Sequence, residues 1–283
     1  MSFASASLPI AYGPLDVPTG VRWSVLWRQS DGAPWVEVAR SADAYYVRVI
    51  GFADFCMTSS AVRVAPREGA RPSTIRHLLL DQVLPLALAA EGHLVLHASG
   101  LVSEGRTIAI AGPAGTGKST LAAALQREGW SVASDDGLVV RERGSEVLAV
   151  PAYPGLRLWP DAAERTGVMP FAVSEVAEYT AKLRVSLAAT TKLEPASLAG
   201  VYVIQQGDTV KIEPLTARDA AMTLIEHAYR ADLTDRAALA AQLGACARLA
   251  TRVRVCRLAV PRDLAQLAAV AGAVDAHARV EAL

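Results

Sequence analysis

The sequence predicts an α/β fold in which a β-rich N-terminal region, residues 1–72, precedes a larger mixed domain, residues 73–283. Two observations support this. The first seventy residues hold short runs of aromatic and β-branched residues, separated by Gly, Pro, Asp and Ser, as strands and turns require. Beyond them, short apolar runs alternate with longer segments whose apolar residues recur at helical spacing, as in strands that pack against helices.

The elements follow in order. In the N-terminal region the pattern predicts strands over residues 21–26, 35–39 and 45–50. A helix is expected over 73–90, capped by Ser73 and kinked or ended by Pro85. In the middle of the chain, the pattern predicts strands at 94–96 and 107–111 around a turn at 103–105. A loop at 112–117 and a helix at 118–128 follow, and the helix ends at Gly129. Next come a strand at 131–133 and a hairpin of 138–142 with 146–150.

The last third predicts a hairpin of residues 198–204 with 210–212, helices over 217–229 and 235–249, and a strand over 253–258. A final helix is expected over 262–277, with Pro261 at its first position.

Composition excludes several classes of protein. Hydrophobic residues make up 52% of the chain, which fits a folded soluble protein. The 28 basic and 28 acidic residues balance, so nothing indicates a nucleic-acid or membrane partner. No signal peptide is evident, and the longest apolar run, 83–90, is too short to span a bilayer, so a cytoplasmic location is expected. The three scattered cysteines are expected to be buried, reduced thiols.

The segment 112–119 reads Gly-Pro-Ala-Gly-Thr-Gly-Lys-Ser and matches G-x-x-x-x-G-K-[ST] at each required position, between a strand and a helix. Glycines let such a loop curl its backbone N–H groups around phosphate oxygens. Lys118 would pair with the terminal phosphates, and the Ser119 hydroxyl suits Mg²⁺. The predicted binding residues for ATP with Mg²⁺ are Gly112, Pro113, Ala114, Gly115, Thr116, Gly117, Lys118, Ser119 and Thr120.

Asp135 and Asp136 end a strand shortly after this loop and its helix, where α/β sheets bind ligands. One carboxylate could hold Mg²⁺ while the other accepts a proton from an attacking hydroxyl; the alternative is a polar turn. His97 ends an earlier strand and would either orient one of these carboxylates or serve a structural purpose.

A cationic residue lies further on, in the segment 154–161, which reads Pro-Gly-Leu-Arg-Leu-Trp-Pro-Asp. Arg157 could neutralise phosphate charge, or be a surface residue beside a packed Trp159. Lys182 and Arg184 are expected on a solvated face.

Three stretches, 96–100, 112–120 and 129–136, together resemble the catalytic domain of HPr kinase/phosphorylase in their order and spacing. The 154–161 run is similar to HPr-kinase-like proteins encoded with lasso-peptide biosynthesis enzymes. The match covers roughly residues 94–161. The later Glu-Ile-Arg-Gly-Leu-Gly-Ile signature of bifunctional HPr kinase is not found, and Ser119-Thr120 stands where that family has Ser-Glu.

The resemblance implies a P-loop core like that of HPr kinase and phosphoenolpyruvate carboxykinase. It implies that Lys118 and the loop amides hold ATP, that Ser119 and Asp136 hold Mg²⁺, and that Asp135 is the base, with His97 beside it. Lys118 and Arg157 are predicted from their own charge as further catalytic residues. The implied activity is ATP-dependent phosphorylation of a hydroxyl, that of the C-terminal serine of a lasso-type precursor peptide. The family's hexamers are compatible with a homo-oligomer. Independently of the resemblance, the strand-rich composition of residues 1–72 leads to the hypothesis that this region helps to recognise the peptide, by adding it to a sheet edge.

Two other functions remain open from the residues alone. One is a kinase for a sugar or another small metabolite, since no acceptor pocket is readable in the sequence. The other is a regulatory module that senses a nucleotide by binding ATP.

Overall fold

The structure is a computed structural model that describes residues 9–58, 60–152, 155–168, 172–186 and 194–280. The chain divides into two compact units, and both contain strands and helices, which confirms the predicted α/β class. The first unit comprises Met1–His93, Val176–Thr180 and Tyr229–Ala240, and the second comprises Leu94–Glu175, Ala181–Ala228 and Ala241–Leu283. No helix in the described part of the chain has both the length and the apolar composition needed to cross a bilayer.

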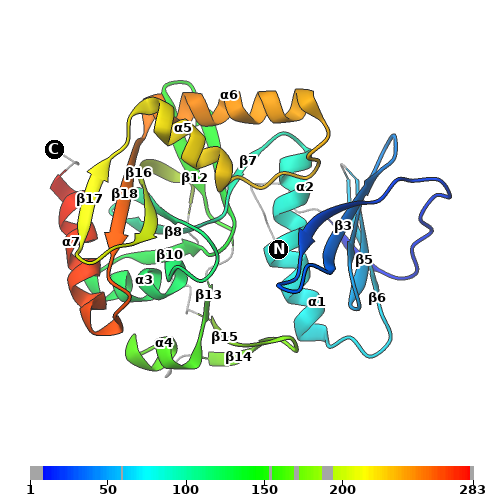
Figure 1. Ribbon diagram of the computed structural model, residues 1–283, viewed down its shortest axis with the longest axis horizontal. Helices are drawn as coiled ribbons and strands as arrows, with labels where there is room; N and C mark the ends of the chain where they lie inside the picture. The colour runs from blue at the N-terminus through cyan, green and yellow to red at the C-terminus, as the bar shows by residue number, and fades with distance from the viewer. Residues whose placement is uncertain (1–8, 59, 153–154, 169–171, 187–193, 281–283) are drawn as a thin grey trace. The chain divides into compact units, whose positions relative to one another are not determined.

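The first unit contains a six-stranded sheet, of which Figure 1 labels β3, β5 and β6. The strand order is β1-β6-β5-β4-β3-β2. Neighbouring strands are antiparallel except for β1 and β6. Its strands are β1 (Ile10–Tyr12), β2 (Ser24–Arg28), β3 (Pro34–Arg40), β4 (Tyr45–Val49), β5 (Ala53–Met57) and β6 (Val62–Pro66). The strands expected over 21–26, 35–39 and 45–50 are therefore confirmed as β2, β3 and β4, whereas β1, β5 and β6 were not predicted.

A helical segment follows this sheet and belongs to the same unit. It consists of α1 (Pro72–Leu78), a π-helical turn η1 (Leu79–Val83) and α2 (Leu84–Ala90). The helix continues through Pro85, and the π turn just before it is the local distortion that a proline inside a helix imposes. The Thr74 hydroxyl accepts a hydrogen bond from the Glu178 N–H at 3.0 Å, which ties this helix to a distant part of the first unit.

The second unit is built on a sheet in the order β10-β8-β9-β16-β12-β11-β7, with β18 paired to β16 and β17 paired to β18. Its strands are β7 (Leu94–Leu96), β8 (Ala98–Ser103), β9 (Arg106–Ala111), β10 (Ser131–Ser134), β11 (Leu138–Arg143), β12 (Glu146–Val150), β16 (Ala196–Gln206), β17 (Lys211–Pro214) and β18 (Arg254–Val260). A three-stranded sheet has the order β13-β15-β14, formed by β13 (Gly155–Leu158), β14 (Ala172–Ala177) and β15 (Thr180–Ser186).

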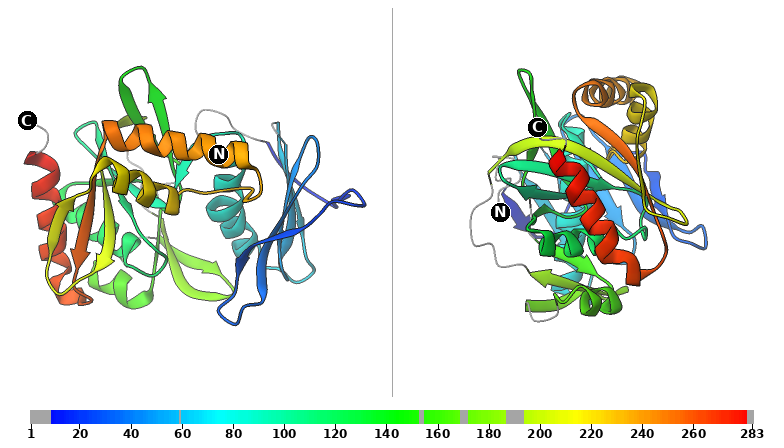
Figure 2. Two further views of the ribbon diagram at one scale, coloured as in Figure 1. Left: turned by 45° about the horizontal axis from the view of Figure 1, so that its top comes forward. Right: turned by 90° about the vertical axis from the view of Figure 1, so that its left-hand side faces the viewer.

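Helices cover both faces of the larger sheet. Along β9 the side chains alternate, so Ile108 and Ile110 pack with α3 (Lys118–Leu125) and α7 (Leu267–Val280), whereas Ala109 and Ala111 face the opposite side. On that side lie α5 (Ala217–Glu226) and α6 (Arg236–Arg252). The right-hand view of Figure 2 shows α7, in red, lying across the strands. The remaining helical segments are η2 (Gln126–Glu128), α4 (Pro160–Arg165) and η3 (Leu264–Gln266).

Three local expectations were wrong. The hairpin partner of β9 is β8, which was not predicted, and β7 pairs with β11 instead. Strand β17 pairs with β18, not with β16, because β16 is already enclosed between β9 and β18. The last helix, α7, begins at Leu267 and not at Pro261, and the short turn η3 (Leu264–Gln266) precedes it. The Asp263 carboxylate caps η3 by accepting a hydrogen bond from the Ala265 N–H at 2.9 Å.

Candidate functional site

The glycine-rich loop 112–117 joins β9 to α3 at the edge where parallel strands end. β9 runs parallel to β16, and β16 runs parallel to β18. Gly112, Gly115 and Gly117 have φ values of 148°, 81° and 96°, in the range that favours glycine. A Cβ atom on Gly112 would lie 3.1 Å from the backbone oxygen of Ile204. The loop shape therefore depends on its glycines, as a backbone cradle for an anion requires.

Two glycines of the second unit should respond oppositely to alanine. Gly117→Ala places a side chain on left-handed backbone and is expected to reduce the free energy of unfolding by about 1–2 kcal/mol. Gly272→Ala, inside α7 with open space around the new methyl group, should raise it by roughly 0.5–1 kcal/mol. Urea unfolding followed by circular dichroism measures both. A stabilising Gly117→Ala would contradict the assigned loop conformation.

Lys118 opens α3 and is 5% exposed. Its Nζ donates hydrogen bonds to the carbonyl oxygens of Gly112 at 2.9 Å and Pro113 at 3.1 Å. Burial lowers the pKa of Lys118, while the charges of Asp136 and Asp135 oppose that shift. The ammonium thus lies under the loop, at the start of a helix whose N-terminal N–H groups favour anions.

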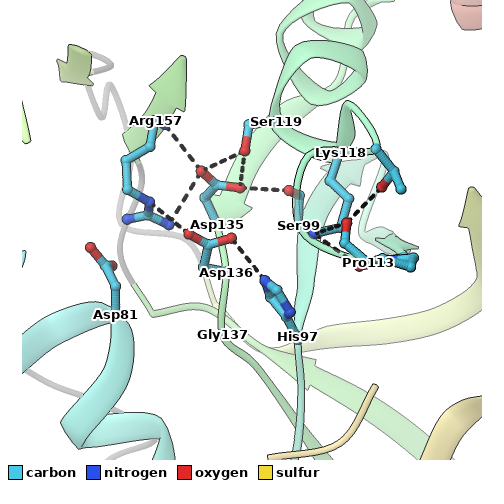
Figure 3. Close-up of polar contacts among 12 residues, drawn as sticks. Asp81, His97, Ser99, Pro113, Lys118, Ser119, Asp135, Asp136, Gly137 and Arg157 are labelled. Atoms are coloured by element: carbon cyan, nitrogen blue, oxygen red, sulfur yellow. Dashed lines mark hydrogen bonds and ion pairs between the residues drawn. The ribbon is translucent and has the colours of Figure 1, made fainter. Parts of the chain in front are cut away.

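Asp135 is enclosed by hydrogen-bond donors, and its side chain has no exposed surface (Figure 3). It accepts hydrogen bonds from the Ser99 hydroxyl at 2.6 Å, the Ser119 hydroxyl at 3.0 and 3.1 Å, and the Arg157 backbone N–H at 3.1 Å. Burial raises the pKa of Asp135, helped by the charge of Asp136 and opposed by that of Arg157. This carboxylate therefore links Ser119, in the first turn of α3, to Ser99 on β8 and to Arg157 on β13.

The Asp136 side chain, unlike that of Asp135, lines an open cavity. Its backbone has φ 65°, unusual for a residue with a side chain, and its side chain is 24% exposed. One carboxylate oxygen lies 3.3 Å from His97 Nε2 and the other 3.0 Å from Arg157 Nε. Burial favours a higher pKa for Asp136, but the charge of Arg157 and the contact with His97 hold it well below its ordinary value. The carboxylate is therefore ionised at neutral pH.

Arg157 bridges the two carboxylates from β13. Its side chain is 2% exposed and also lies 3.2 Å from Asp135. It is not a surface residue, and Trp159, 48% exposed, is not a packed core residue. Arg184, on β15, pairs with Arg157 of the adjacent strand β13 and is also buried, so the expectation of a solvated face was wrong for Arg184. Pro154, the first residue of the 154–161 motif, lies outside the described residues.

Sequence reasoning missed two features of the site. The first is Ser99, which lies two positions after His97, so strand periodicity is the signal that would have placed both near the carboxylates. The second is the pair of Lys182 and Trp159, which line the cavity together, with Lys182 Nζ 5.8 Å from the centre of a Trp159 ring. No local sequence pattern connects these two residues.

The cavity has a volume of about 600 Å³, within the range of small-molecule sites. Seven of the predicted binding residues line it: Ala114, Gly115, Thr116, Gly117, Lys118, Ser119 and Thr120. The donor set also suits Mg²⁺, because the Ser119 hydroxyl and the aspartates offer hard oxygen atoms. Among the described residues, no group of three or more His, Cys, Asp or Glu side chains is placed to hold a metal ion.

Comparisons with known proteins add a structural likeness. The sequence matches no protein-family model, and no curated protein matches it. Among solved structures, one that resembles it is the Hpr(Ser) kinase/phosphatase from Coxiella burnetii, at 13% identity and a TM-score of 0.35. The match covers 66% of this chain and 97% of that chain. A similarity at this level establishes neither a shared family nor a shared activity.

Proposed function

We propose that this protein is a kinase that transfers the γ-phosphoryl group of ATP to a hydroxyl group. The observation that supports it best is that the G-x-x-x-x-G-K-S loop and the His97–Asp136 pair face one cavity. A protein that only senses a nucleotide needs the loop, but not an ionised carboxylate beside the place where the terminal phosphate would lie.

Each residue of the site then has a role. The loop N–H groups and Lys118 hold the phosphates of ATP. Ser119 would hold Mg²⁺, and Asp135 would keep the Ser119 hydroxyl in place by accepting its hydrogen bond. When bound, Mg²⁺ neutralises phosphate charge and orients the terminal phosphate. The sequence-based expectation placed Mg²⁺ on Asp136 and the base at Asp135. The contacts favour the opposite division, because Asp135 is enclosed with Ser119 whereas Asp136 faces the cavity.

Asp136 orients the acceptor hydroxyl and takes its proton. The acceptor oxygen forms a bond to the γ-phosphorus while the bond to the β–γ bridging oxygen breaks, and ADP leaves. A weakly basic carboxylate is sufficient, because the loose transition state of phosphoryl transfer needs little negative charge on the attacking oxygen. His97 and Arg157 keep Asp136 ionised and oriented, so most of the catalysis comes from positioning and charge.

For the acceptor we propose the C-terminal serine of a lasso-type precursor peptide, which the 154–161 run supports by its resemblance to kinases of that pathway. Incubation with Mg-ATP and a panel of acceptors, followed by mass spectrometry, tests the proposal. The panel contains a serine-ended precursor peptide, HPr and common sugars. The expected result is one added phosphate on the peptide.

The same assay on Lys118→Ala serves as the control. The Lys118 ammonium is buried beneath the loop, 2.9 Å from the Gly112 carbonyl oxygen. Removing it should abolish transfer and weaken ATP binding at least about tenfold, because the charge-assisted contact that Lys118 is proposed to make with phosphate is lost. Transfer to a sugar alone would show that the acceptor is a small molecule and not the peptide. Tight ATP binding without transfer to any acceptor would favour the nucleotide sensor.

A further inference from the structure

One side of the cavity is apolar, and the mechanism above makes no use of it. Its wall comes from the ends of β16 and β18 and from the segment that leads into α7. Ile204, Val260, Leu264 and Leu267 line it. Three of these side chains, those of Val260, Leu264 and Leu267, are only partly buried. A flat apolar group that covered them would remove aliphatic surface from water, which favours binding.

The strand order places this wall on the opposite flank of the loop from the carboxylates. β9, which leads into the loop, lies between β8 and β16. β10, which leads into Asp135 and Asp136, lies beyond β8, whereas β18 lies beyond β16. The pairings make β9, β10, β16 and β18 run in one direction, so their carboxyl ends share one edge of the sheet.

The apolar wall also adjoins the loop directly. Ala111, the last residue of β9, pairs with Val203, and β16 continues for three more residues to Gln206, beside Val260. Gly112 lies against Ile204, as the 3.1 Å distance from its Cβ position to the Ile204 oxygen shows. A triphosphate held by the loop with its last phosphate toward Asp136 would direct its other end to this wall.

We infer that Ile204, Val260, Leu264 and Leu267 form the subsite for the nucleobase of the triphosphate. The inference rests on the proposed function, because it takes the loop to hold the phosphates. The base lies against the aliphatic wall, and the exposed side chains of Gln206 and Arg262 line the same part of the cavity as polar groups. The acceptor therefore enters from the other flank, beside Asp136, Trp159 and Lys182.

Comparing Mg-ATP with magnesium tripolyphosphate tests the subsite, because tripolyphosphate has the phosphates without the base. Isothermal titration calorimetry should show that the wild type binds ATP more tightly. Leu267→Asn removes part of the aliphatic wall without adding charge and should weaken ATP binding about tenfold. Tripolyphosphate binding should stay within about twofold of wild type. Ala268→Asn, exposed at the next position of α7, is the matched control and should change neither affinity.

Val260→Thr keeps the size of the side chain and provides a second variant if Leu267→Asn fails to fold. It should also weaken ATP binding and leave tripolyphosphate binding unchanged. Equal losses of affinity for ATP and tripolyphosphate, or no loss of affinity for either in a folded variant, would overturn the subsite. Wild-type protein that binds tripolyphosphate as tightly as ATP would overturn the subsite alone. Binding of neither ligand would overturn the proposed function and the subsite together.

Discussion

Replacing Asp136 with Asn is expected to slow phosphoryl transfer by about 10²–10⁴-fold, the usual contribution of a positioned proton acceptor. The amide keeps the size of the carboxylate and its place beside His97, but it cannot take a proton from the acceptor hydroxyl. ATP affinity should stay within about threefold of wild type, because the loop and Lys118 are untouched. Single-turnover kinetics with the acceptor identified by mass spectrometry, together with ATP titration, measure both quantities.

The neighbouring variant Asp135→Asn is the matched control, since it makes the same chemical change one residue away. Asp135 contacts Ser119, so its replacement should raise the Mg²⁺ concentration needed for half-maximal activity by about tenfold or more. Asp136→Asn should leave that Mg²⁺ dependence unchanged. The reverse pattern, in which Asp135→Asn alone removes turnover and Asp136→Asn shifts the Mg²⁺ dependence, would restore the division of roles expected from the sequence.

Arg157→Leu should produce the largest loss of stability, about 3–5 kcal/mol in the free energy of unfolding, because it removes the cation from a buried ion pair. The Arg157 side chain is 2% exposed and lies 3.2 Å from Asp135 and 3.0 Å from Asp136. Without it, the fully enclosed Asp135 would remain beside a second negative charge. Urea unfolding at neutral pH, followed by circular dichroism, measures the change.

Arg143→Leu provides the comparison on a neighbouring hairpin. Arg143 pairs with Glu146 at 2.7 Å, but the two side chains are 70% and 54% exposed, so water screens the pair and the loss should be far smaller. If Arg157→Leu cost no more than Arg143→Leu, Arg157 would not be the residue that compensates the two carboxylates.

The glycine-rich loop is the part of the site that could be predicted residue by residue. Its strand, loop and helix were expected at 107–111, 112–117 and 118–128 and are observed as β9, the loop and α3 followed by η2. Such a motif is local, because glycine conformation, helix initiation and the order of residues along the chain specify it together. The hairpin of β11 and β12 was predicted for the same reason, since its strands are joined by a short turn.

Pairings between distant segments were not predictable in this way. β8 was missed, and β17 was assigned to the wrong partner, because an apolar run shows that a strand is buried but does not identify its neighbour. The apolar wall at Ile204 and Leu267 lies far along the chain from the loop it adjoins. Only the parallel pairing of β9, β16 and β18 brings these segments to one edge.

The sequence by itself determined the α/β class, the glycine-rich loop and the set of charged residues around it. The tertiary structure decided which of those side chains are enclosed and which line the cavity. Asp135 and Asp136 are adjacent and chemically identical, so local sequence could not assign their roles. The left-handed backbone at Asp136 and the burial of Asp135 against Ser99, Ser119 and Arg157 separate them. The physical reason is that exposure and hydrogen-bond partners depend on segments that meet only when the chain folds.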